Sequence, residues 1–127
     1  MAEIVIRHRK HSSARVKLRN GSLVEVDSGV RELIPAMNVP GLQTFASCQG
    51  RNGSEWDGYG YVLFSGSLAK PFMHAILRRW LKTSLMPLDG LAFENYGKTF
   101  VIRWNRRDYK KLLHCARGAV REVRKQR

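Results

Sequence analysis

The most constraining feature of the sequence is the apolar spacing of its last twenty or so residues. At about 100° per residue, positions three and four apart share one side of an α-helix. The apolar positions of this segment follow that spacing, and they are Tyr109, Leu112, Leu113, Ala116, Val120 and Val123. A helix with one apolar side needs another layer to cover it, so this segment predicts a packed, layered domain.

The same segment predicts a second, cationic stripe beside the apolar one. Its positions recur at intervals of three and four, and they are Arg107, Lys110, His114, Arg117, Arg121 and Arg124. A solvated helix face usually mixes acidic with basic residues, which form pairs one turn apart. This stripe contains no acidic residue. We therefore expect one side of the helix to dock on the domain and its flank to present a row of cations.

The rest of the chain alternates strand and helix signals. Residues 59–64 predict a strand with Tyr59, Tyr61 and Leu63 on one face and with the intervening residues on the other. Residues 42–47 predict a further strand after a Val39-Pro40-Gly41 turn. Hairpins are indicated within 14–26, around Asn20-Gly21, and from 91–94 to 99–104, around Tyr96-Gly97.

Two more helices are expected. Asp27 and Ser28 are good N-caps for a helix that runs to Met37, although Pro35 must kink it or end it early. Another helix is predicted over 69–85, where Pro71 falls in the tolerant first turn. The order of elements predicts an α+β fold of the ferredoxin-like type, with one antiparallel sheet and helices packed on one face.

We expect a single domain, because 127 residues suffice for one core. Within it, residues 1–13 form a basic N-terminal strand or arm, 14–104 the α+β core, and 105–127 the basic amphipathic helix. No apolar run reaches the roughly 20 residues that a membrane span needs. A cytoplasmic protein without a membrane partner is therefore expected.

Charge is the strongest functional signal in the sequence. The net charge of +13 is concentrated at the two ends, where residues 1–20 carry +5 and residues 106–127 carry +7. Basic side chains neutralise phosphates and release counterions, so the pattern favours a partner such as RNA, another nucleic acid or a nucleoprotein complex. The N-terminal arm would contribute Arg7, Arg9, Lys10, Arg15, Lys17 and Arg19. The alternative is a generally basic protein with solvated ends.

Residues 57–64, DGYGYVLF, resemble the octapeptide of RNA recognition motifs, with Asp57 in place of that motif's basic residue. The resemblance implies that Tyr59 and Tyr61 project from an open sheet face and stack on bases, and Trp56 could add a further ring. Stacking of this kind contributes on the order of 1 to 3 kcal/mol per base.

Residues 33–50, LIPAMNVPGLQTFASCQG, resemble the signature of the tRNA wybutosine-synthesizing protein 3 family and its small relatives. The strand Tyr61-Val62-Leu63-Phe64 and the helix start Pro71-Phe72-Met73-His74 continue the likeness. The resemblance implies methyl transfer from S-adenosylmethionine to a tRNA guanosine derivative. Ser47, Cys48, Gly50 and Arg51 would then line a ligand loop, and His74 would face it.

Other catalytic signals are sparse, and the sequence does not establish an enzyme. Phosphate-cradling glycine loops and the common hydrolase and zinc-protease motifs are absent from the sequence. Cys48 is the one nucleophile candidate, and neither cysteine has metal-ligand spacing, so no metal and no cofactor are predicted outside the S-adenosylmethionine alternative. Three hypotheses stay open: an RNA-binding protein, a small tRNA-modification-like enzyme or nucleotide-binding protein, and a phage or mobile-element inhibitor of a host nucleic-acid machine.

Overall fold

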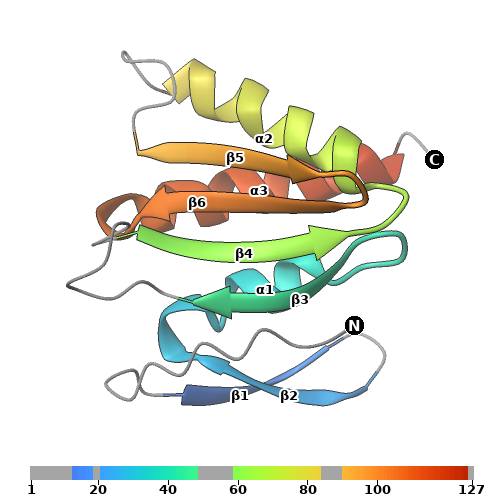
Figure 1. Cartoon of the computed structure of the whole chain (residues 1–127), viewed down its shortest axis with the longest axis vertical. Helices are drawn as coiled ribbons and strands as arrows, with labels where there is room; N and C mark the ends of the chain where they lie inside the picture. The colour runs from blue at the N-terminus through green and yellow to red at the C-terminus, as the bar shows by residue number, and fades with distance from the viewer. Residues whose placement is uncertain (1–12, 19–20, 49–58, 84–89, 126–127) are drawn as a thin grey trace.

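A computed structural model describes residues 13–18, 21–48, 59–83 and 90–125. Its centre is a four-stranded antiparallel sheet in the order β3-β4-β6-β5 (Figure 1). The strands are β3 (Gln43–Cys48), β4 (Tyr59–Ser65), β5 (Leu91–Tyr96) and β6 (Thr99–Asn105). The helices α1 (Leu33–Met37) and α3 (Tyr109–Lys125) lie behind the sheet in that view, and α2 (Ala69–Thr83) lies along its β5 edge. The predicted α+β architecture is confirmed.

The chain builds the sheet from two similar units. A hairpin followed by a helix, β3-β4-α2, is succeeded by a second, β5-β6-α3. The second strand of each unit lies at the centre of the sheet, where β4 and β6 pair antiparallel. As a result α2 and α3 pack against each other behind the sheet.

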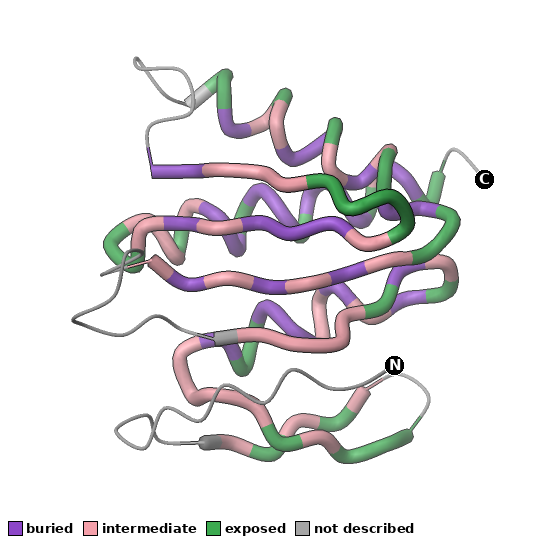
Figure 2. The backbone as a smooth tube through the Cα atoms, viewed as in Figure 1, coloured by how far each residue is buried: buried purple, intermediate pink, exposed green. Residues whose placement is uncertain are grey.

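The core lies between the sheet and the helices. Burial alternates along β4, where Gly60, Val62 and Phe64 are buried and the residues between them are half-buried (Figure 2). The Phe64 ring meets Phe72 of α2 edge to face at 5.6 Å and stacks on Phe100 of β6 at 5.8 Å. Aromatic contacts of this kind add to the free energy of burial. The faces of β4 and the apolar side of α3 are as predicted, and Leu112, Ala116 and Val123 of α3 belong to the core.

The N-terminal part of the described chain forms a separate two-stranded sheet of β1 (Ser13–Lys17) and β2 (Leu23–Asp27). The hairpin is confirmed, with Gly21 at a positive φ of 89° in its turn; Asn20 lies outside the described residues. In Figure 1 this sheet lies beyond β3, at the opposite end of the molecule from α2.

The expected helix of residues 27–37 divides into two short pieces, which resolves the conflict with Pro35. A 3-10 turn, η1 (Ser28–Val30), precedes α1, and Pro35 lies in the first turn of α1, where a missing N–H costs little. Asp27 precedes η1 but makes no side-chain cap hydrogen bond there. The capping predicted for Asp27 is therefore wrong.

A close approach of two turns fixes where α2 begins. Gly66 has a φ of 125°, and a Cβ at this position would lie 2.2 Å from the carbonyl oxygen of Gly41. That oxygen accepts a hydrogen bond of 2.8 Å from the N–H of Leu68, next to the helix start. Only glycine fits at position 66, because another residue would be strained and would collide with backbone. None of the described helices is long and apolar enough to cross a membrane.

Candidate nucleic-acid interface

The cationic stripe predicted for the last helix is present on α3. All six of its residues are exposed, and Arg107 belongs to a 3-10 turn, η2 (Arg106–Asp108), that leads into the helix. From Lys110 to Arg124 the stripe is about 21 Å long at 1.5 Å per residue. Arg107 lies 3.5 Å from the carboxylate of Asp108. Within the described ranges, no ion pair joins Lys110, Arg121 or Arg124 to an acidic side chain.

A second row of basic residues, which sequence reasoning missed, runs along α2. Its members recur at every fourth position and all are exposed: Lys70, His74, Arg78 and Lys82. The signal was available in the sequence, because α2 contains no acidic residue and residues four apart are neighbours on a helix. The sequence predicted for His74 only a place facing the ligand loop of the enzyme hypothesis.

The two rows belong to one surface, because α2 and α3 are neighbours that run antiparallel. Along α2, Arg78 pairs with Glu122 late in α3, whereas the Trp80 ring centre, two residues further on, lies 4.2 Å from Lys111 near the start of α3. We call the exposed basic residues of α2 and α3 the helix surface. The two helices carry four and six lysine or arginine residues against the single carboxylate of Glu122, a net +9 of the whole chain's +13.

A small cavity lies where the two rows meet. Its volume is about 200 Å³, and we call it the notch; it is lined by Arg78, Arg79, Lys82, His114, Cys115 and Glu122. One oxygen of Glu122 accepts a hydrogen bond from Arg78, and the other accepts one from Arg79 at 3.3 Å. Burial raises the pKa of the Cys115 thiol. The thiol is therefore neutral near pH 7 and is a poor nucleophile.

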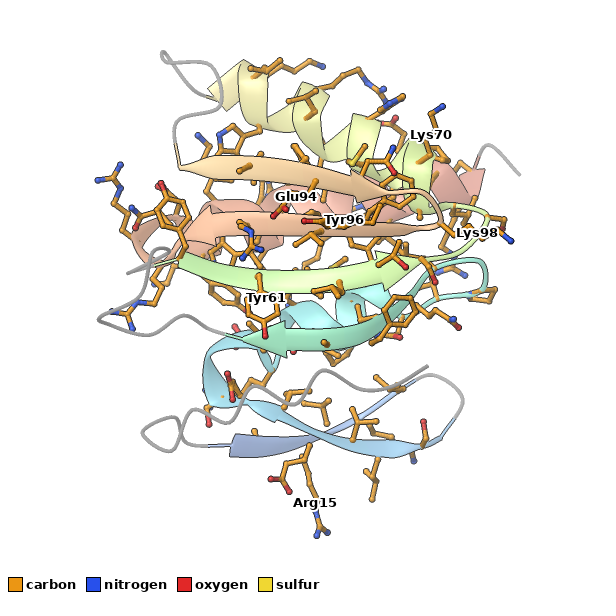
Figure 3. The ribbon with its side chains drawn as sticks, in the orientation of Figure 1. Arg15, Tyr61, Lys70, Glu94, Tyr96 and Lys98 are labelled. Atoms are coloured by element: carbon orange, nitrogen blue, oxygen red, sulfur yellow. The ribbon has the colours of Figure 1, made fainter. Side chains whose placement is uncertain are left out.

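The opposite face of the sheet, which we call the sheet surface, satisfies its own charges. Arg103 of β6 binds Glu94 of β5, and the hydroxyl of Tyr96 donates to the same carboxylate (Figure 3). The hydrogen bond from Tyr96, together with Arg103, holds the pKa of Glu94 below its usual value. The Arg103 guanidinium also lies 5.6 Å from the centre of the Tyr61 ring, a cation–π contact.

Tyr59 and Tyr61 are half-buried on the sheet surface, the face predicted for them. Because Arg103 lies over Tyr61, a nucleobase would have to displace this guanidinium or stack on it. Trp56, the third ring of the stacking prediction, lies outside the described residues.

Most of the predicted N-terminal arm also lies outside the described residues, namely Arg7, Arg9, Lys10 and Arg19. Arg15 and Lys17 are exposed on β1. In Figure 3, Arg15 points away from the sheet and helices, at the far end from α2. The structure therefore does not bring Arg15 onto the helix surface.

Within the described part of the chain, the residues of the enzyme hypothesis are not gathered into a site. Ser47 pairs with Val62 on the core side of β3, and Cys48 is the last residue of that strand, opposite Tyr61. His74 is exposed on α2, which lies beside β5 at the other edge of the sheet (Figure 1). Gly50 and Arg51 are not among the described residues. No group of three or more His, Cys, Asp or Glu side chains within the described segments could hold a metal ion.

Comparison with known proteins does not identify a family for this chain. No family model, no curated protein and no solved structure matches the chain. The resemblances of residues 57–64 and 33–50 stay predictions.

Proposed function

We propose that the protein binds RNA through the helix surface of α2 and α3. The observation that carries the proposal is the charge of these two helices, which carry ten lysine or arginine side chains and one carboxylate. Folded proteins usually pair basic side chains with acidic ones or keep like charges apart, because repulsion between like charges destabilises the compact state. A surface with this excess of positive over negative side chains is the electrostatic footprint of a polyanion partner.

The arrangement supports recognition of the phosphate backbone more than of base sequence. Lysine and arginine rows along helices contact phosphates and position the protein, but they read little sequence directly. The resemblance of residues 57–64 to the RNA recognition motif favours RNA over DNA as the partner. In this proposal the helix surface supplies affinity, and Tyr59 and Tyr61 on the sheet surface supply at most a secondary contact.

The proposal requires a steep dependence on salt. If about five side chains neutralise phosphates of a single strand, the logarithm of the binding constant falls with that of salt at a slope of about −3.5. Raising the salt concentration fourfold then weakens binding by about a hundredfold. Fluorescence anisotropy of a labelled single-stranded RNA measures this slope.

Two matched charge reversals test the location of the site. The double variant Arg117→Glu/Arg121→Glu changes the stripe of α3, and Arg15→Glu/Lys17→Glu changes the exposed side of β1. Each lowers the net charge from +13 to +9, since every reversal removes two units. We expect the α3 variant to lose about a hundredfold in RNA affinity at low salt, and the β1 variant to lose less than about fivefold.

Circular dichroism of both variants controls for folding, which is expected to be unchanged because all four side chains are exposed. Equal losses in the two variants would mean that binding follows total charge, with no particular surface. Wild-type affinity in the α3 variant would refute the proposal directly.

A further inference from the structure

The notch between α2 and α3 differs from the rest of the helix surface, because it is concave and two of its cations, Arg78 and Arg79, are held in place by Glu122. Arg78, Arg79 and Lys82 bring three positive charges to its lining, and Glu122 brings one negative charge. The net charge of the lining is therefore +2. A phosphate monoester carries about −1.5 to −2 at neutral pH, which matches that charge.

Glu122 fixes the position of the two arginines. Its two oxygens accept from Arg78 and Arg79 separately, which holds both guanidinium groups at the wall of the notch. A guanidinium has five N–H donors, so one bond to Glu122 leaves donors over on each arginine. Prealigned donors of this kind bind an oxyanion with less loss of side-chain entropy than mobile lysines do.

Arg79 is also positioned by α3 itself. Its guanidinium lies directly over Gly118, where a Cβ would be 2.5 Å from Nη1 and 2.8 Å from Cζ. Any larger residue at position 118 would push the guanidinium away. The Nε of Arg79 is buried and has no hydrogen-bond acceptor in the described part of the chain. This burial shows how closely the Arg79 guanidinium packs against α3, which fixes its position.

The size of the notch limits what it can hold. Its volume of about 200 Å³ is below the roughly 300 to 1,000 Å³ of ordinary small-molecule sites. A water occupies about 30 Å³, so a tetrahedral phosphate fits with several waters around it. His114 adds an imidazole to the rim and Cys115 a neutral thiol to the wall, neither of which opposes an anion.

We propose that the notch is a phosphate-binding site, in which Arg78, Arg79 and Lys82 bind one phosphate group and Glu122 and Gly118 hold Arg79 in position. The proposal rests on the RNA-binding function for the source of that phosphate. Two sources share this chemistry, the 5′-terminal phosphate of an RNA and a phosphodiester within it, and the experiment separates them.

The test compares three variants with the wild type. Gly118→Ala displaces the Arg79 guanidinium without changing charge. Arg78→Ala/Lys82→Ala removes two cations from the notch. The matched control Lys110→Ala/Arg121→Ala removes one lysine and one arginine from the α3 stripe, outside the notch.

The probes are a short single-stranded RNA labelled at its 3′ end, made with a 5′-phosphate or a 5′-hydroxyl, and inorganic phosphate as competitor at constant ionic strength. For the wild type we expect the 5′-phosphate RNA to bind about five- to tenfold more tightly. This preference should disappear in Gly118→Ala and in the Arg78/Lys82 variant. The Lys110/Arg121 control should keep it while binding both RNAs more weakly.

A second outcome also supports the proposal. The two RNAs bind alike, and inorganic phosphate displaces RNA from the wild type but not from Gly118→Ala. The site then holds an internal phosphodiester. The proposal is refuted if Gly118→Ala matches the wild type in RNA affinity and in sensitivity to inorganic phosphate, and if the two double variants lose RNA affinity equally. The helix surface would then bind RNA without a phosphate site in the notch.

If the wild type does not bind RNA at all, the notch can still be tested separately. In that case the thermal midpoint is measured with inorganic phosphate alone, since a ligand of the folded state raises it. A rise in the wild type that Gly118→Ala lacks supports the notch without the RNA function. The absence of a rise in the wild type refutes the notch as well. Loss of fold does not confuse these outcomes, because alanine favours a helix more than glycine does and the displaced group is the end of a flexible side chain.

Discussion

The sheet surface and the helix surface handle charge in opposite ways. On the sheet surface, the carboxylate of Glu94 is bound by Arg103 of the adjacent strand β6 and by Tyr96 of its own strand β5. On α2 and α3 together, ten lysine or arginine side chains accompany the single carboxylate of Glu122, which binds Arg78 and Arg79. Charges paired within the chain stabilise the fold, whereas a surface with an excess of one sign can attract a partner of the opposite sign. In the proposed function, pairs on the sheet surface contribute to stability and the helix surface binds the partner.

The largest expected effect tests whether the α2 row belongs to the binding surface. Lys70→Glu/Lys82→Glu should weaken RNA binding by about a hundredfold at low salt, as much as the α3 reversal, because both rows would contact the same backbone. Anisotropy titrations at several salt concentrations measure the loss, with Arg15→Glu/Lys17→Glu as the charge-matched control. An α2 variant that binds like this control would restrict the interface to α3.

Two arginine-to-alanine changes should give opposite results on the two faces. Arg121→Ala should lower RNA affinity by about fivefold and leave the free energy of unfolding unchanged, because the side chain is exposed and makes no ion pair with the described acidic residues. Arg103→Ala should leave RNA affinity unchanged and cost about 1 kcal/mol of stability, because Glu94 and the Tyr61 ring lose their cation.

Urea denaturation and anisotropy on the same preparations measure both quantities. A loss of RNA affinity in Arg103→Ala would show that the sheet surface takes part in binding, and would break the division between the faces.

The smallest effect concerns the pH dependence of the sheet surface. The pKa of Glu94 in the folded state is lower than in the unfolded chain. Its contribution to stability is therefore complete above the unfolded value and is lost as the pH falls through the folded value. We expect Glu94→Gln to be less stable than the wild type by less than about 1 kcal/mol at pH 7, because the carboxylate is partly exposed.

That difference should shrink below about pH 4.5, the ordinary value for a glutamic acid, and denaturation curves from pH 7 to pH 3 follow it. RNA affinity should be unchanged in Glu94→Gln at pH 7, since the negative charge that the substitution removes lies on the sheet surface. A difference in stability that persists undiminished at acid pH would mean that Glu94 acts through packing and not through its charge.

Much of the fold was predictable because its signals are local. The alternation along 59–64 identified both the strand and the face that enters the core, and the spacing in α3 identified its apolar side. The conflict at Pro35 was visible in the sequence, but its outcome, two short helical pieces, depended on where the chain had to turn before β3. The α2 row was equally visible at intervals of four and was missed because Lys70, Arg78 and Lys82 lie in the near-neutral middle of the chain.

By itself the sequence determined most of the elements, the apolar faces of β4 and α3 and the cationic stripe of α3, because each follows from a short-range repeat. Only the tertiary structure decided that the stripe meets a second row on α2, that Glu122 binds arginines more than forty positions away, and that Gly118 makes room for Arg79. Those contacts depend on how two helices pack over a shared sheet. That packing is set by the core side chains of both units together, so no single segment encodes it.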